Sequence, residues 1–332
     1  MDRKRPYQHR ALNRLLCILC ILPVMSCTWV KDDTADCPYG FWLQLHYTYN
    51  ILDVEAAPRY VTDADVYVYD ADGNFVRRIH ATQADLAANG YQVRVEGLPE
   101  GDYQFVVWSG MGNSQYAVAG DTQAIGDFRL SLAGAGTSFA EELPALFHGF
   151  LPVVHYDDSY ARHDVELTKD TNQLACLVVA VDGQTMADAD DFTMKVMAAN
   201  ATMDAHNRTA TEVETVYEPF AQEAVVLDDA EYGELHGMKF SLMTLRLMND
   251  RDCRLILEKK STGKAVFNLS FPEYIGMVGT YYTNLGREIS VQEYLDRQDF
   301  YTIVFYLSGD LNLLLQLQVN SWRLRAYNHV KL

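Results

Sequence analysis

The sequence of 332 residues lacks an apolar run long enough to cross a bilayer as a helix. Its longest run, Leu15 to Met25, covers about eleven residues, whereas a spanning helix needs about 20. The sequence therefore does not predict a transmembrane helix.

Catalytic and metal-binding motifs are missing as well. There is no His-Glu-x-x-His, nucleophile elbow, P-loop or dinucleotide fingerprint. In Asp70-Ala71-Asp72-Gly73-Asn74 the glycine comes too early for an EF-hand, so a hairpin turn is the better interpretation. We expect no enzymatic activity, metal or cofactor, although catalytic groups can also come together from separated loops; the residues weighed for such a site are Asp188, Asp190, Asp191, His148, His155 and His163.

Basic residues and cysteines are scarce. The chain has 27 Lys and Arg against 45 Asp and Glu, a formal net charge of −18. Such a surface repels nucleic acid and anionic head groups, so we expect no nucleic-acid partner. Of six cysteines, the three beyond Cys27 stand at no zinc or redox spacing, and a disulfide among Cys37, Cys176 and Cys253 is left open.

The N-terminus has the pattern of a secretion signal. Five basic residues precede the apolar run, and Val24-Met25-Ser26-Cys27 resembles a bacterial lipobox. We expect residues 1–26 to be removed, Cys27 to be lipidated, and residues 27–37 to form a tether to the outer membrane. The alternative is an ordinary signal peptide with a chance cysteine.

A short acidic motif follows the lipobox. Lys31-Asp32-Asp33 resembles the export signal that sends lipoproteins of Bacteroides-type bacteria to the cell surface. The alternative is that the two aspartates only keep a flexible start soluble.

From Phe41 onward the sequence alternates as short β-strands do. Phe41, Leu43, Leu45, Tyr47 and Tyr49 share one predicted strand face. Asp72-Gly73 is a strong hairpin signal, because the turn needs positive φ angles. Ser290 and Glu293 predict one helix start. With strands frequent and helices sparse, we predict a mainly β chain with two tandem sandwich domains, residues 38–169 and 170–332.

Aromatic residues are plentiful, with 21 Tyr, 14 Phe and 4 Trp. Most stand at alternating strand positions, where aromatic side chains pack well on a pleated surface. A core role is therefore the better interpretation, and a carbohydrate-binding platform is the alternative.

Several segments, taken in order, resemble the FimB-type anchor and minor-subunit lipoproteins of type V fimbriae in Bacteroides-like bacteria. Together they span nearly the whole chain. The matching parts are Cys27, residues 36–50, Val66 to Asp70, Leu167 to Asn172, Gln292 to Arg297 with Tyr301 to Tyr306, and Val319 to Trp322.

This resemblance implies transthyretin-like or immunoglobulin-like sandwiches and a lipid-anchored subunit at the base of a fimbrium. Such a subunit attaches the fibre and ends its growth. Its partners would be major pilin subunits, joined by strand exchange or side contacts. Related pilins open an acceptor groove when an Arg- or Lys-specific protease removes their first strand, but here Lys31 is the only basic residue between Cys27 and the first strand. We therefore expect the groove to stay shut.

With a shut groove, the C-terminus is the expected contact with the polymer. Trp322, Leu324 and Tyr327 are the candidate residues. The alternative is that Trp322 and Leu324 merely continue the same sandwich. Two other function classes are kept open, a surface glycan-binding lipoprotein and a hydrolase on a β scaffold.

Overall fold

The computed structural model describes residues 40–112, 115–119, 123–157, 159–181, 191–210, 212–279, 288–308, 313–319 and 322–325. The leader, Cys27 and the tether lie outside this part. The chain from Gly40 onward forms one compact unit. No helix within the described ranges has the length and apolar character needed to span a membrane.

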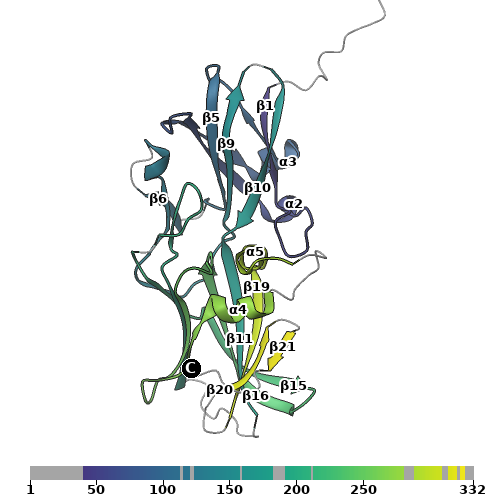
Figure 1. The fold of residues 1–332 in the computed structure, drawn as a ribbon, viewed down its shortest axis with the longest axis vertical. Coiled ribbons are helices and arrows are strands. Elements are labelled where there is room, and N and C mark those ends of the chain that lie inside the picture. Colours follow the sequence, from purple (N-terminus) through teal and green to yellow (C-terminus); the bar gives the residue numbers. More distant parts are fainter. Residues whose placement is uncertain are drawn as a thin grey trace, which may run out of the picture. The chain divides into compact units, whose positions relative to one another are not determined.

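A seven-stranded sheet takes up the first half of the chain (Figure 1). Its strand order is β3-β2-β5-β9-β10-β1-β4. The strands are β1 Phe41–His46, β2 Asp63–Asp70, β3 Phe75–Thr82, β4 Gln92–Val95, β5 Gly101–Ser109, β9 Phe147–Tyr156 and β10 Ala161–Lys169.

Two features of this sheet, the buried face of β1 and the β2–β3 hairpin, confirm predictions from the sequence. Phe41, Leu43 and Leu45 are buried along one face of β1. At the turn between β2 and β3, Gly73 has a φ of +82° and donates its N–H to the carbonyl of Asp70. The strand β1 nevertheless ends at His46, short of the predicted Tyr49, for a reason given below.

Two sheets dominate the second half. The six-stranded sheet has the order β15-β16-β11-β19-β20-β21, and the five-stranded sheet β18-β17-β12-β14-β8. Their strands are β8 Ser138–Phe139, β11 Thr171–Ala180, β12 Phe192–Ala198, β14 Thr215–Tyr217, β15 Ala221–Asp229, β16 Gly233–Leu245, β17 Cys253–Lys259, β18 Lys264–Ser270, β19 Phe300–Leu307, β20 Leu313–Val319 and β21 Trp322–Arg325.

Short strands cross between the halves. β8 belongs to the first half of the sequence and pairs with β14 of the second. A three-stranded sheet joins β6 Tyr116–Ala119 and β7 Arg129–Leu132 to β13 Thr202–Asp204. The boundary predicted between residues 169 and 170 falls between β10 and β11, and these crossing strands tie the two sides of it together.

The hydrophobic core follows the same plan. One cluster, with Phe41, Val66 and Phe105, lies inside the first half. A larger cluster joins Trp108 and Phe128 of the first half to residues of β11, β16 and β19. The larger cluster therefore spans both halves, which favours their unfolding together.

Helices are few among the described residues. They are α2 Ala57–Tyr60, α3 Gln83–Ala88, α4 Phe271–Gly279 and α5 Val291–Arg297, with a 3₁₀ turn η4 at Ile125–Asp127. Ser290 caps α5 by accepting the N–H of Glu293 at 3.1 Å, as its sequence predicts. The capping box of α3, formed by Thr82 and Asp85, and the helix α4 are additions to the sequence-based interpretation.

Candidate functional site

The first strand fills an interior place in its sheet. β1 pairs in parallel with β10, from Phe41 opposite Ala161 to His46 opposite Glu166, and antiparallel with β4 on its other side. Phe41, Leu43 and Leu45 are at most 1% exposed. Burying three such side chains contributes roughly 5–9 kcal/mol before other costs are counted. The strand is therefore held by pairing on both sides and by burial of one face.

Beyond His46 the chain stops pairing as a strand because carboxylates take its N–H groups. The Glu166 carboxylate accepts from the Thr48 and Tyr49 amides at 2.7 and 2.9 Å. Glu55 accepts from the amide of Tyr47 at 3.1 Å. These hydrogen bonds replace the strand pairing that the alternating sequence predicts for Tyr47 to Tyr49.

His46 and Glu55 form an ion pair at this end of β1, with 2.7 Å between Nδ1 and Oε2. Burial lowers the pKa of His46, but hydrogen bonds to Glu55 and Asp164 outweigh it, so the pKa is raised. For Glu55 burial acts in the opposite direction and raises the pKa. Hydrogen bonds from Ala57, His46 and Tyr47 outweigh it, so the pKa of Glu55 is lowered. Both shifts favour the charged pair.

The joint, defined here as Lys169 to Thr171 between β10 and β11, is surrounded by polar groups. Arg246 binds Asp296 of α5 with two bonds of 2.9 Å and donates to the Asn207 carbonyl at 2.5 Å. Lys169 pairs with Asp299 just beyond α5. These bonds attach α5 and the residues just after it to both halves of the chain.

Asp170 lies at the centre of the joint and is fully buried. Its Oδ1 accepts a hydrogen bond from Asn207 at 2.8 Å, and Arg246 Nε is 3.9 Å away. Among the described residues no donor reaches its Oδ2. Burial raises the pKa of Asp170 to about 7, and the guanidinium of Arg246 offsets only part of this because Asp296 is its closer partner.

Two of the three candidate residues near the C-terminus, Trp322 and Leu324, fall in β21. Trp322 stands opposite Val319, and Leu324 stands opposite Leu317, so β21 is an antiparallel edge strand next to β20. Tyr327 lies outside the described residues. Whether these residues contact a polymer remains a prediction.

The register gives the direction of this last strand. β1 and β10 run together toward the joint, and β19 runs from the joint in parallel with β11. β20 returns along β19, and β21 turns back along β20. Gly40 therefore lies at the end of the seven-stranded sheet away from the joint, while β21, on the other side of the joint, runs away from it toward Arg325.

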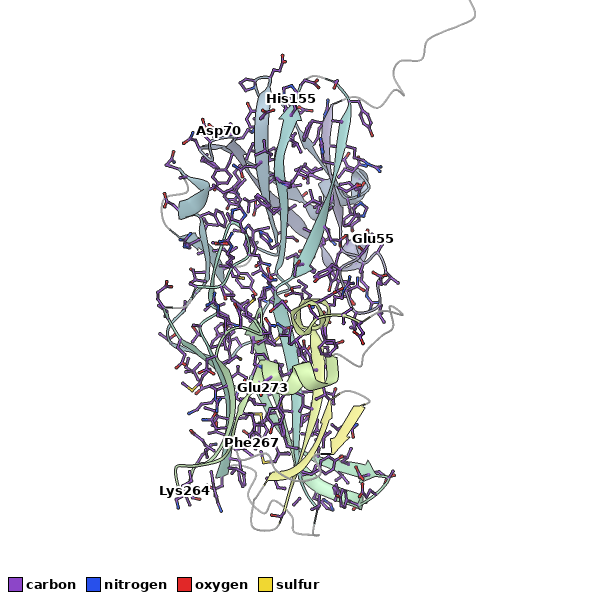
Figure 2. All side chains as sticks on the ribbon, in the orientation of Figure 1. Glu55, Asp70, His155, Lys264, Phe267 and Glu273 are labelled. Atoms are coloured by element: carbon purple, nitrogen blue, oxygen red, sulfur yellow. The ribbon has the colours of Figure 1, made fainter. Side chains whose placement is uncertain are left out.

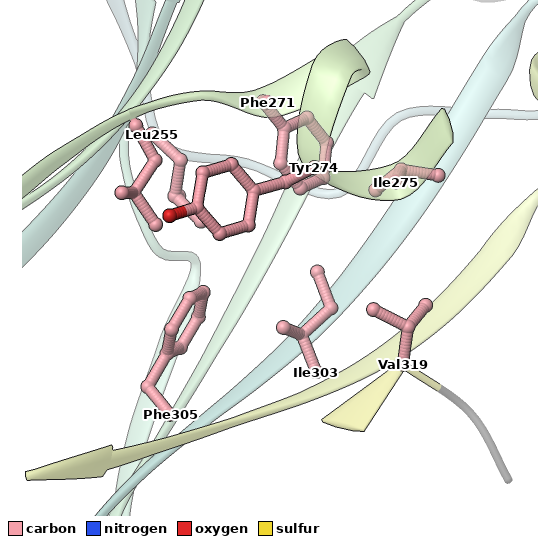
Figure 3. A pocket seen from close by; sticks show the side chains of 8 residues that line it. Leu255, Phe271, Tyr274, Ile275, Ile303, Phe305 and Val319 are labelled. Carbon is pink, nitrogen blue, oxygen red and sulfur yellow. The ribbon is translucent and has the colours of Figure 1, made fainter. Parts of the chain in front are cut away.

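An apolar pocket lies beside α4, lined by residues of the six-stranded and five-stranded sheets. It measures about 210 Å³, including its opening to solvent. Ile303, Phe305 and Val319 come from the six-stranded sheet, and α4 contributes Phe271, Tyr274 and Ile275 (Figure 3). The helix α4 thus packs over this pocket, next to residues of β19 and β20.

The residues weighed for catalysis do not converge. His148 is buried against Trp108, with 4.7 Å between ring centroids. His155 is exposed at the far end of the first half, near Asp70, and bonds Asp102 (Figure 2). His163 stacks on Phe41.

The carboxylates considered for metal binding also have other partners. Asp70 accepts the N–H groups of Asp72 and Asn74 within its own turn, and Asp191 binds Ser261. Asp188 and Asp190 lie outside the described residues. No group of possible metal ligands occurs in the portion of the chain that the structure covers.

The large aromatic side chains serve mainly as core. Trp108, Tyr69, Tyr217 and Phe240 are among the largest fully buried residues. Burial of this kind takes them away from any surface platform for sugars.

The comparisons with known proteins decide the family. A family model described as fimbrillin-A associated anchor proteins Mfa1 and Mfa2 matches residues 33–328. The chain belongs to this family. Among curated proteins, none matches the chain.

Solved structures share the fold of this Mfa2-type chain. A candidate adhesin of Bacteroides thetaiotaomicron has a TM-score of 0.75 at 23% identity, covering 87% of this chain and 98% of that one. A candidate polysaccharide-binding protein of the same species has a TM-score of 0.74 at 26% identity, covering 86% and 98%. The fimbrial anchor protein Mfa2 of Porphyromonas gingivalis has a TM-score of 0.65 at 16% identity, covering 88% and 100%.

Some residues that shape this Mfa2-type fold were missed by reasoning from the sequence. Glu166 and Arg297 stand in segments that resemble exposed strand and helix positions, and their partners lie more than 100 residues away in the chain. The only sequence signal is that Glu293 and Arg297 stand four residues apart, the spacing that allows an ion pair on a helix. Their use at the end of β1 depends on the tertiary fold.

Proposed function

We propose that this chain is a lipid-anchored outer-membrane subunit at the base of a fimbrium, which holds the fibre on the cell and ends its growth. The observation that carries the proposal is the seated strand β1. A subunit accepts a foreign strand only where a sheet edge and its apolar pockets are open. With β1 in place, this subunit cannot be extended from that side.

The basic residues of the chain support a retained strand. After Lys31 the next Lys or Arg is Arg59. Arg59 lies in α2, directly after Pro58, and its guanidinium is 5.3 Å from the ring centre of Tyr60. A cut after Lys31 leaves β1 in the chain, and the helical turn presents Arg59 poorly to a protease that needs an extended substrate.

The two ends of the described chain suit a base subunit. Cys27, lipidated in this proposal, precedes Gly40 by a tether of about 12 residues that reaches at most about 40 Å. Gly40 leaves the fold at the end away from the joint, and β21 runs the other way. In this proposal β21 therefore runs away from the membrane, and we assign Trp322, Leu324 and Tyr327 to the contact with the first pilin, as strand donor or by side contacts.

The test is to express the Cys27→Ser variant in fimbriated cells that lack the wild-type gene. We expect both the variant and the fimbriae to move from the cell fraction to the medium, because several acyl chains make attachment effectively permanent. A purified variant with an unchanged urea midpoint controls for folding. Variant protein that still fractionates with membranes would refute lipid anchoring. Fimbriae that stay on the cells while the variant is released would refute the anchor role.

A further inference from the structure

The segment that leaves β1 is fastened to both halves of the chain. On one side Glu166 of β10 receives three hydrogen bonds, from the amides of Thr48 and Tyr49 and from Thr48 Oγ1 at 2.7 Å. Glu166 is also the residue that stands opposite His46 in the register. It therefore binds the chain at the very point where the β1 ladder ends.

On the other side Arg297 of α5 holds the same segment across the joint. Its Nη1 donates to the Asn50 carbonyl at 3.2 Å, and its guanidinium lies over the Tyr49 ring at 4.3 Å. The side chain is 8% exposed, and Glu293 fixes its Nε at 2.9 Å. A buried arginine held from both sides gives a rigid attachment, since its planar group is already oriented.

The segment itself is stiff enough to transmit this attachment to β1. Asn50 is 7% exposed, and its amide donates to the carbonyls of Tyr47 and Val54 at 2.9 and 2.7 Å. Glu55 closes the loop by accepting the amides of Tyr47 and Ala57. The end of β1 cannot fray without breaking these bonds.

A donor strand replaces a resident strand by taking over its ladder from a frayed end, one residue pair after another. The place where fraying can begin therefore matters more than the total affinity of the strand. In this chain the C-terminal end of β1 is bound on both sides. Its buried side chains alone would not hinder a competitor with similar side chains, because such a competitor gains the same burial.

We infer that Glu166 and Arg297 form a clasp that keeps β1 in its sheet against a competing strand, even when the chain is cut downstream of β1. The inference deepens the proposed role, since it names the residues that keep the groove shut. It gives the chain a second safeguard against extension, beside the absence of any Lys or Arg between Lys31 and Arg59.

The experiment uses the full mature chain with Cys27→Ser and a site-specific protease sequence inserted between Leu52 and Asp53. Leu52 is 64% exposed, so the insertion is accessible. After cutting, the fragment that ends at Leu52 keeps β1 and both clasp contacts. A fluorescent peptide of residues 38–52 is then added in excess, and the exchange of fragment for peptide is followed by anisotropy.

We expect the cut parent to exchange slowly, and Glu166→Gln and Arg297→Gln each to exchange about tenfold faster or more, because each change removes charge-assisted bonds at the fraying end. Glu258→Gln and Arg254→Gln are the matched controls. Their partners are Lys195 and Asn268 on strands of the five-stranded sheet. Both controls should exchange like the parent.

Exchange at the parent rate in both clasp variants would overturn the inference, as would equal acceleration in the controls. Glu166 is exposed, so its variant is expected to fold even if Arg297→Gln does not, and urea midpoints are measured on the uncut proteins. No pilin is present in this assay. Failure of the clasp therefore leaves the anchoring test with Cys27→Ser unaffected, and failure of anchoring leaves the exchange rates unaffected.

Discussion

The joint makes a strong prediction about pH, and Asp170→Asn is the change that tests it. Burial raises the pKa of Asp170 from 3.8 to about 7. Because one pKa unit corresponds to about 1.4 kcal/mol, holding the ionised carboxylate in the fold costs about 4 kcal/mol. The amide of Asn keeps an oxygen for the Asn207 donor and carries no charge.

The sign follows from proton linkage. A folded pKa above the unfolded value gives a contribution to stability that is fully present below about pH 4 and is lost as the pH rises through about 7. His148 acts in the opposite sense: burial lowers its pKa to about 4, so its contribution is present above about pH 6.5 and is lost as the pH falls. In the wild type the two slopes largely cancel between these limits.

The assay is urea unfolding of wild type and Asp170→Asn across this pH range. Near pH 4 we expect the two proteins to be about equally stable, and near pH 8 we expect the variant to be more stable by about 2–4 kcal/mol, the lower figure allowing for an amide N–H without an acceptor. In the variant, the free energy of unfolding should rise with pH between about 4 and 6.5 by the full contribution of His148.

Asp296→Asn is the control, because it leaves Arg246 without its bidentate partner and should destabilise the fold by about 3–5 kcal/mol near pH 8, where Asp170→Asn stabilises it. If Asp170→Asn instead destabilises equally at every pH, then Asp170 is an ionised partner of Arg246 and the reasoning is wrong.

Other parts of the fold give further predictions. Truncation after Val319 removes β21, an edge strand paired with β20. The shortened protein should still fold by circular dichroism, but cells that carry it should release their fimbriae. Loss of folding would show that β21 serves only the stability of its own sheet. A Cβ at Gly237 would lie 2.1 Å from the Val178 carbonyl oxygen. Gly237→Ala should therefore lower the free energy of unfolding, measured in urea, by about 3 kcal/mol or more. Gly90→Ala, where only a positive φ is strained, should lower it by about 1 kcal/mol. Cys176 and Cys253 are free and buried, so a thiol reagent should reach them only on unfolding; fast labelling of either in the native protein would contradict the packing. Without pilin, the Cys27→Ser protein should be a monomer by light scattering, and oligomers that break up on deletion of β1 would count against a shut groove.

The sequence predicted those features that depend on near neighbours. The alternation of Phe41, Leu43 and Leu45 indicates a half-buried strand, and Asp72-Gly73 indicates a hairpin, because both follow from local backbone geometry. The cap at Ser290 is local too. Each of these is found in the structure.

Features that join distant segments could not be read from the sequence. β8 and β13 have two and three residues, too few to show any period, and their pairing across the halves depends on the finished fold. The early end of β1 depends on Glu166, which lies 118 residues beyond Thr48. In the sequence Asp170 stands only at the predicted domain boundary, and its tertiary surroundings are what raise its pKa.

The most direct test of the whole account is mass spectrometry of the chain isolated from the membranes of fimbriated cells. The account predicts an N-terminal peptide that begins at an acylated Cys27 and continues without interruption through Phe41–His46 to at least Arg59. A mature chain that begins at Tyr60, with β1 absent, would contradict it, because the groove would then be open and the subunit could accept a strand.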